Sequence, residues 1–198
     1  AGTAWRDRIG LHVNLTQFEP VGGGDGLEAV IRRDGRFAGR RALFKAGLAG
    51  RLGVDAIVRE AEAQWDRCIQ NGITPSHLDT HQHAHLVPVV FRALHGMAEE
   101  KGVPLRQLSH SAKARGVRKR LKSLVAAGLT HYNERQFAPG SRRGAELLSI
   151  FSTGEKPSVE AYRALIENSR TDCIELMVHP AAVDEVHRGS TRISAVSQ

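Results

Sequence analysis

The chain has 198 residues, of which 41% are hydrophobic and 25% are charged. These values are typical of a folded globular protein and exclude a long disordered chain, so we expect a single domain over residues 1–198. No apolar run approaches the roughly 20 residues needed to cross a bilayer, and we therefore expect no membrane partner.

The charge of the chain bears on its possible binding partners, and its cysteines bear on its cellular location. The formal net charge is +7, and much of the excess lies in residues 113–122, KARGVRKRLK. Because no aromatic residue is interleaved there, the stacking pattern of single-strand binders is missing, and we do not expect a nucleic-acid partner. Cys68 and Cys173 form no CxxC pair, which argues against a disulfide scaffold and indicates a reducing, cytoplasmic location. The sequence leaves open whether the chain forms homo-oligomers.

The first third of the chain contains a predicted strand, a glycine-rich loop and a helix. Residues Ile9 to Thr16 alternate apolar and polar side chains, which predicts a strand. Residues 20–26, PVGGGDG, lack the Lys-Ser/Thr ending of a phosphate-binding loop, so we expect a flexible turn. From Val54 to Ile69 the apolar residues recur at helical spacing, and Gly72 follows as a stop signal.

The same alternation continues after residue 75. Residues 76–79, SHLD, predict a second strand, which leads into a run of histidines. Pro88 is predicted to begin a helix that Gly102 ends, and Val103 to Leu108 predict a short third strand.

The last part of the chain adds one more helix and one more strand. Ser158 is predicted to cap a helix that runs through Arg170, and Cys173 to Val178 predict a buried strand that ends at His179. Helices that alternate with short strands indicate an α/β fold with mainly parallel strands. In such folds ligands bind at the carboxyl ends of the strands.

The stretch HLDTHQHAH, residues 77–85, carries the clearest chemical signal. On a strand, successive side chains point to opposite faces, so five polar residues would share one face: His77, Asp79, His81, His83 and His85. Neutral imidazole is the commonest protein ligand for divalent first-row metals. A straight row would extend over about 20 Å, so we expect one or two of its members to bind a metal and the others to orient them or to line a substrate groove.

A structural role is the alternative for each of these residues. A lone histidine is usually a satisfied core or surface residue, and His12 by itself could be either. Arg106, by itself, is better explained as structural. Four imidazoles in one short run would pack poorly in an apolar core, which favours a site over packing for the row as a group.

Four motifs in this order resemble the YdjC-like carbohydrate deacetylases, the family of the chitooligosaccharide deacetylases of ChbG type. They are IGLHVNLT from residue 9, PSHLDTHQHAHLVPVVFRAL from residue 75, GVPLR from residue 102 and ELMVHPA from residue 175. The resemblance covers Ile9 to about Asp184, and it is loose between Lys113 and Phe151.

The resemblance implies a fold, a reaction and roles for particular residues. The implied fold is a distorted (β/α) barrel, and the implied reaction is the removal of acetyl groups from a small N-acetylated oligosaccharide with a divalent metal ion, magnesium or zinc. The family's histidine ligands correspond to His12 and His81. His179 corresponds to a histidine at the mouth of the site, as proton donor or substrate contact, and Arg106 to an arginine that holds a carboxylate.

The sequence departs from the family at its front. The family opens with a strand that ends in an Asp-Asp pair, a metal ligand and a general base, and nothing before His12 matches that pair. We therefore expect an N-terminally truncated, incomplete barrel, and an incomplete set of metal ligands unless Asp79 or another residue substitutes for the missing carboxylate. Whether this chain alone is active stays open.

Two other functions remain possible from sequence. The chain could be a non-catalytic sugar- or metal-binding module on the same scaffold, as the absent Asp-Asp pair suggests. It could also catalyse metal-assisted hydrolysis of another amide or ester, because the residues of such motifs indicate how the metal and the water are bound more than which acyl group is removed.

Overall fold

A computed structural model describes residues 8–106, 117–137, 146–149, 158–169 and 174–178. The chain forms two compact units: residues 1–106 with 128–141, and residues 107–127 with 142–198. Each unit is described by itself, and the expectation of a single domain stays a prediction.

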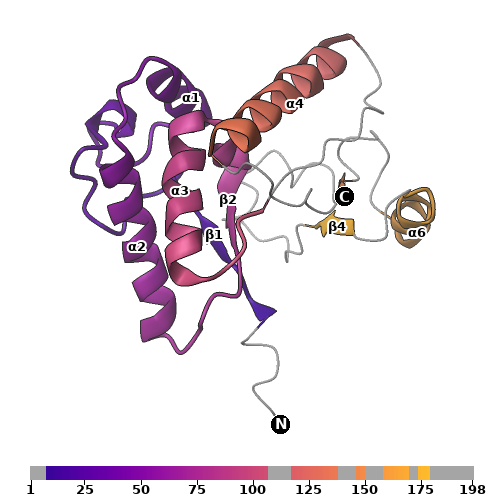
Figure 1. Ribbon diagram of the computed structural model, residues 1–198, viewed down its shortest axis with the longest axis horizontal. Coiled ribbons are helices and arrows are strands. Elements are labelled where there is room, and N and C mark those ends of the chain that lie inside the picture. Colours follow the sequence, from indigo (N-terminus) through magenta and orange to yellow (C-terminus); the bar gives the residue numbers. More distant parts are fainter. Residues whose placement is uncertain (1–7, 107–116, 138–145, 150–157, 170–173, 179–198) are drawn as a thin grey trace. The chain divides into compact units, whose positions relative to one another are not determined.

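The first unit is built on short parallel strands with helices between them (Figure 1). Strand β1 is Leu11–Val13 and strand β2 is Leu78–Thr80, and they pair in parallel with Leu11 opposite Leu78. Leu105 forms a parallel bridge with Leu78 on the other side of β2. The order in space is therefore β1, β2 and the Leu105 segment, as successive βαβ units require.

Three helices connect these strands. They are α1 (Arg40–Leu48), α2 (Val54–Gln70) and α3 (Pro88–Lys101), preceded by a short 3₁₀ turn, η2 (Glu28–Val30). The predicted helix after residue 54 is confirmed as α2 and ends one residue later than expected. The predicted helix at Pro88 is confirmed as α3, with Gly102 as a left-handed C-cap at φ 68°.

The core of this unit lies between β1, β2 and the helices. Helices α2 and α3 lie side by side (Figure 1). Leu11 and Val13 of β1 and Leu78 of β2 are buried on the face that contributes to this core. The helices add buried apolar residues at helical spacing: Ile57, Ala61 and Trp65 from α2, and Val90, Leu94 and Met97 from α3. This one-sided burial leaves the opposite face of β1 and β2 for polar side chains.

The long helix α4 (Val117–Phe137) belongs to both units, and its residues from Gly128 onward are part of the first. The second unit also contains β3 (Glu146–Ser149), α6 (Val159–Glu167) and β4 (Ile174–Met177), and β3 pairs with β4 in parallel. Ser158 caps α6 as expected, accepting a hydrogen bond from the Ala161 amide at 3.1 Å, but the helix ends at Glu167 and not at Arg170.

Several strand predictions need correction. β1 covers only Leu11–Val13, because Asn14 turns the chain through hydrogen bonds from the Thr16 and Gln17 amides. β4 is half-buried along its length and not buried. Of the expected strand from Val103 to Leu108, residues 103–106 show a single bridge at Leu105, and residues 107–108 lie outside the described part of the chain. The described residues form an α/β structure with parallel strand pairs, and the barrel stays a prediction.

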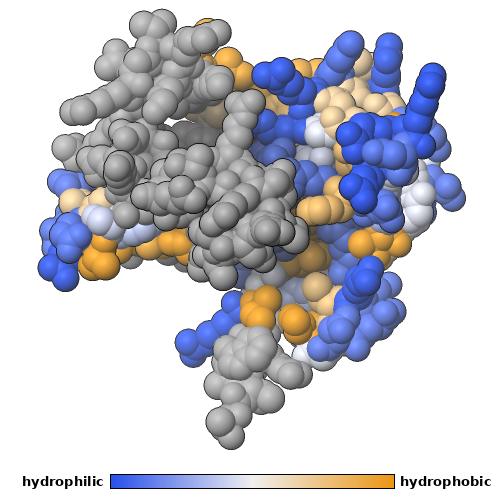
Figure 2. All heavy atoms as spheres, turned by 180° about the vertical axis from the view of Figure 1, so that it is seen from behind, coloured by the Kyte–Doolittle hydropathy of each residue, from blue (hydrophilic) through white to orange (hydrophobic). Residues whose placement is uncertain are grey.

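Figure 2 shows one face of the molecule. The coloured part of Figure 2 is mainly hydrophilic, with hydrophobic residues in separate small groups. None of the helices in the described part of the chain is long and apolar enough to cross a membrane.

Candidate functional site

His12 and Asp79 lie next to each other on the face of the strands opposite the core. The parallel register places His12 of β1 directly beside Asp79 of β2. His12 Nδ1 lies 2.6 Å from Asp79 Oδ1, and the two side chains are 52% and 15% exposed. An ionised carboxylate can only accept, so His12 Nδ1 donates to Asp79, and Nε2 is the nitrogen that faces His81. This is the orientation in which a carboxylate prepares an imidazole to bind a metal.

His81 approaches the other nitrogen of His12. It follows β2 directly, and its Nδ1 lies 3.3 Å from His12 Nε2. Two nitrogen ligands of one tetrahedral zinc ion, each about 2.0–2.1 Å from the metal, are about 3.3 Å apart. The two imidazoles, from segments 69 residues apart, therefore have the spacing of a pair of ligands to one ion.

Arg106 is placed on the second oxygen of Asp79. Its backbone amide donates to Leu78 O at 2.8 Å, which fixes it beside β2, and its Nη1 lies 3.1 Å from Asp79 Oδ2. Burial acts to raise the pKa of Asp79, but the hydrogen bond and charge of His12 and the charge of Arg106 outweigh it and hold that pKa below its ordinary value. Asp79 is thus kept as an anion with both oxygens engaged.

The prediction of one straight polar row over residues 77–85 is wrong. After Thr80 the chain enters a 3₁₀ turn, η3 (His81–Leu86), in which Gln82 and His83 adopt left-handed backbone angles with φ of 54° and 57°. The turn removes His83 and His85 from the face shared by Asp79 and His81. His83 and His85 instead lie near each other, with ring centroids 6.2 Å apart.

His85 belongs to a buried polar cluster that supports this turn. Its Nδ1 lies 2.5 Å from the Thr80 hydroxyl, which also accepts from the His85 amide at 3.1 Å. Asn133 of α4 donates from Nδ2 to the carbonyls of His85 and Leu86, both at 3.2 Å. Thr80, His85 and Asn133 are 1%, 2% and 1% exposed. We call these three residues the turn clasp.

His77 lies on the expected face but near the start of β2. It is exposed, its Nδ1 lies 3.0 Å from the Ser76 hydroxyl, and its ring occupies the space that a Cβ on Gly10 would need. Glycine at position 10 therefore allows the close approach of the imidazole.

The donor set for a metal is partial within the described residues. No group of three or more His, Cys, Asp or Glu side chains in that part of the chain is arranged to hold an ion. His12 and His81 fit two positions of a site, and Asp79 orients His12 while it is held by Arg106. His179 lies outside the described residues, as do residues 113–116 of the basic segment.

Sequence reasoning missed a second buried network that fixes the loop after β1. Glu60 of α2, 2% exposed, accepts from the Val21 and Gly22 amides at 2.9 and 2.7 Å. Gln64 donates to Glu60 at 2.7 Å and to the carbonyl of Asn14 at 2.8 Å. The signal in the sequence was a glutamate on the apolar face of α2, between Ile57 and Ala61.

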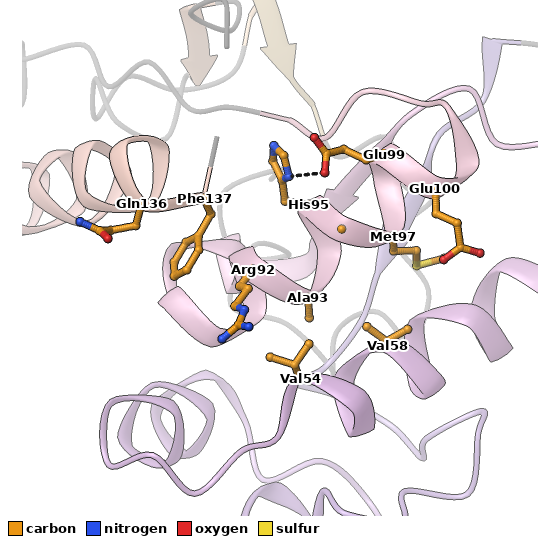
Figure 3. Close-up of a pocket in the computed structure, with 11 residues that line it drawn as sticks. Val54, Val58, Arg92, Ala93, His95, Met97, Glu99, Glu100, Gln136 and Phe137 are labelled. Atoms are coloured by element: carbon orange, nitrogen blue, oxygen red, sulfur yellow. Dashed lines mark ion pairs between the residues drawn. The ribbon is translucent and has the colours of Figure 1, made fainter. Parts of the chain in front are cut away.

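A separate pocket of about 460 Å³ lies between α2, α3 and the end of α4 (Figure 3). Val54 and Val58 face Ala93 and Met97 across it, and His95 lies 3.5 Å from Glu99. None of the predicted site residues lines this pocket.

Comparison with known proteins identifies the family of the chain. The family model described as "YdjC-like protein" matches residues 2–197. A chitooligosaccharide deacetylase of Yersinia enterocolitica is 25% identical over 182 residues, covering 90% of this chain and 62% of the relative. A carbohydrate deacetylase of Listeria monocytogenes is 29% identical, covering 91% of this chain and 62% of the relative.

A crystal structure from Enterococcus faecalis V583, of a protein named for cellobiose-phosphate cleavage, has a similar fold. Its TM-score is 0.63 at 20% identity, and the match covers 93% of this chain and 64% of that one. This chain thus spans less than two thirds of the length of these relatives. Because the family model matches nearly all of it, the chain belongs to the YdjC-like family.

Proposed function

We propose that this chain carries the metal-binding part of a carbohydrate deacetylase. The proposed reaction is metal-dependent hydrolysis of an N-acetyl group on a small N-acetylated oligosaccharide. The single observation that carries the proposal is the 3.3 Å approach of His12 Nε2 to His81 Nδ1, with Asp79 on the other nitrogen of His12. The names of the Yersinia and Listeria relatives support the substrate class.

The chain's own residues would prepare the ligands. Arg106 keeps Asp79 ionised, and Asp79 holds the proton on His12 Nδ1. His12 Nε2, on the side of His81, would therefore be the atom that binds the metal. A bound zinc or magnesium ion would supply an acidified water and polarise the acetyl carbonyl. His179 is proposed to donate the proton to the departing amine, a role that imidazole can perform near neutral pH.

An assay for acetate release from diacetylchitobiose in the presence of zinc or magnesium tests this proposal. We expect metal-dependent release by the chain and a loss of at least about tenfold in His81→Ala. Release that is equal with and without a chelator, or unchanged in His81→Ala, would contradict it.

A second function is favoured by one specific observation. The described residues supply two imidazoles but no group of three metal-binding side chains, which suits a non-catalytic sugar- or metal-binding module. Calorimetry with diacetylchitobiose distinguishes the two functions, because a module would bind the sugar and release no acetate.

A further inference from the structure

Backbone strain gathers in the loops next to the two candidate ligands. Within the described residues, three non-glycine residues have positive φ: Phe18, Gln82 and His83. Gln82 and His83 follow His81, and Phe18 lies in the loop that follows His12. Such angles are rare for bulky side chains, and residues that keep them are concentrated at functional sites.

Phe18 does not offset its strain by burial. Its φ is 59° and its side chain is 65% exposed, so the ring contributes little to the core. Glycine would adopt this backbone angle without steric cost. A large exposed aromatic ring at such a position therefore calls for an explanation other than packing.

The loop that carries Phe18 is held firmly on both sides. The Phe37 amide donates to the Phe18 carbonyl at 2.8 Å. Before it, Asn14 Oδ1 accepts from the Thr16 and Gln17 amides at 3.0 and 3.1 Å. After it, buried Glu60 holds the Val21 and Gly22 amides. The ring is thus presented to solvent by a preorganised backbone, which reduces the entropy lost when a ligand binds.

The loop that carries Phe18 follows the strand that contains His12. Phe18 is six residues after His12 in sequence, so their Cα atoms are at most about 20 Å apart. His12 lies within β1, and Phe18 lies in the loop that follows the carboxyl end of that strand, where ligands of parallel α/β folds bind. An oligosaccharide can cover a distance of that size.

The surroundings of Phe18 suit a sugar. The neighbouring Glu19 carboxylate lies 3.7 Å from Arg36 Nε, and both side chains are exposed, at 70% and 55%. An aromatic face beside exposed charged groups matches a pyranose ring, which has an apolar C–H face and a rim of hydroxyls.

We propose that Phe18 is a stacking platform for a sugar ring of the substrate other than the one that carries the reacting acetyl group. This inference rests on the proposed function and deepens it, because it makes the site selective for chains of two or more sugars. Glu19 and Arg36 flank the platform and hydrogen-bond hydroxyl groups of the same ring.

Calorimetry with triacetylchitotriose and with N-acetylglucosamine tests the platform in wild type, Phe18→Gly, Phe18→Ala and Phe18→Trp. We expect the ratio of trisaccharide to monosaccharide affinity to fall about tenfold in the glycine and alanine variants and to be kept in the tryptophan variant. Phe18→Gly should unfold close to the wild-type temperature, because relief of the backbone strain opposes the greater conformational freedom that glycine gives the unfolded chain. Leu48→Ala, which removes an equally exposed apolar side chain from α1, should bind like wild type.

The outcomes distinguish the platform from the function on which it rests. A wild-type affinity ratio in Phe18→Gly would overturn the platform alone. Failure of the wild-type chain to bind either sugar would overturn both the platform and the proposed function.

Discussion

At the scale of single residues, Asp79 connects His12 to Arg106 in the candidate site. One oxygen accepts from His12 Nδ1 at 2.6 Å, and the other lies 3.1 Å from Arg106 Nη1. The burial of Arg106 lowers its pKa, and the charge of Asp79 acts in the opposite direction. The two side chains therefore depend on each other, and removing the carboxylate charge would affect both the arginine and the orientation of the imidazole.

We expect Asp79→Asn to weaken zinc binding by about 10- to 100-fold, the range typical of residues that orient a metal ligand. An amide can still accept a hydrogen bond, but it no longer stabilises the proton on His12 Nδ1 by charge. Isothermal titration of zinc into the protein measures the effect.

Asp34→Asn is the matched control for this change. Asp34 also pairs with an arginine, Arg32 at 2.7 Å, but that pair is on the surface, with both side chains 53% exposed. The zinc affinity of the Asp34→Asn variant should equal that of wild type. Equal affinities in Asp79→Asn and Asp34→Asn would show that Asp79 does not orient a ligand.

At the scale of structural elements, the 3₁₀ turn η3 determines where His81 lies. Its two left-handed residues are unfavourable by themselves, and the turn clasp of Thr80, His85 and Asn133 compensates for them with buried hydrogen bonds. Because Asn133 belongs to α4, the position of that helix is coupled to the turn that follows β2.

Thr80→Val should therefore lower both the free energy of unfolding and the affinity of the candidate site for zinc. The substitution keeps the side-chain shape but removes the hydroxyl that pairs with the His85 ring and amide, at a cost of about 1–3 kcal/mol for buried groups left unpaired. Urea unfolding measures the free energy, and zinc titration measures the site.

Thr80→Ser is the control because it keeps the hydroxyl. We expect the Thr80→Ser variant to keep a zinc affinity near the wild-type value, even if the loss of the methyl group lowers stability slightly. If Thr80→Val bound zinc as tightly as Thr80→Ser, the turn clasp would have no role in placing His81.

At the scale of the whole molecule, the helices were the most predictable part. Residues 54–70 and 88–101 bury apolar side chains at helical spacing, and Pro88 and Gly102 mark the ends of the second helix. α1 was not predicted because only Leu43 and Ala46 of its nine residues are buried. α4 was not predicted either, and it exposes Leu121, Leu124 and Val125, so its apolar residues do not mark one buried face.

The candidate site was predictable in part. The pairing of His12 with His81 depends on two strand ends that the motifs identify, and the structure brings the two rings together. The turn at Gln82 and His83 was not predictable from its own residues, because an alternating polar run favours a strand. Its conformation depends on Asn133, which is 48 residues beyond His85 in the chain.

The central claim of this account is that His12 and His81 bind the same metal ion. Zinc titration of wild type, His12→Ala, His81→Ala and the double variant tests it, with exposed His131→Ala as the control. We predict that each single substitution lowers affinity at least about tenfold, that the double variant loses less than the sum of the two effects, and that the control binds like wild type. Wild-type affinity in either single variant, or losses that add fully in the double variant, would contradict the claim.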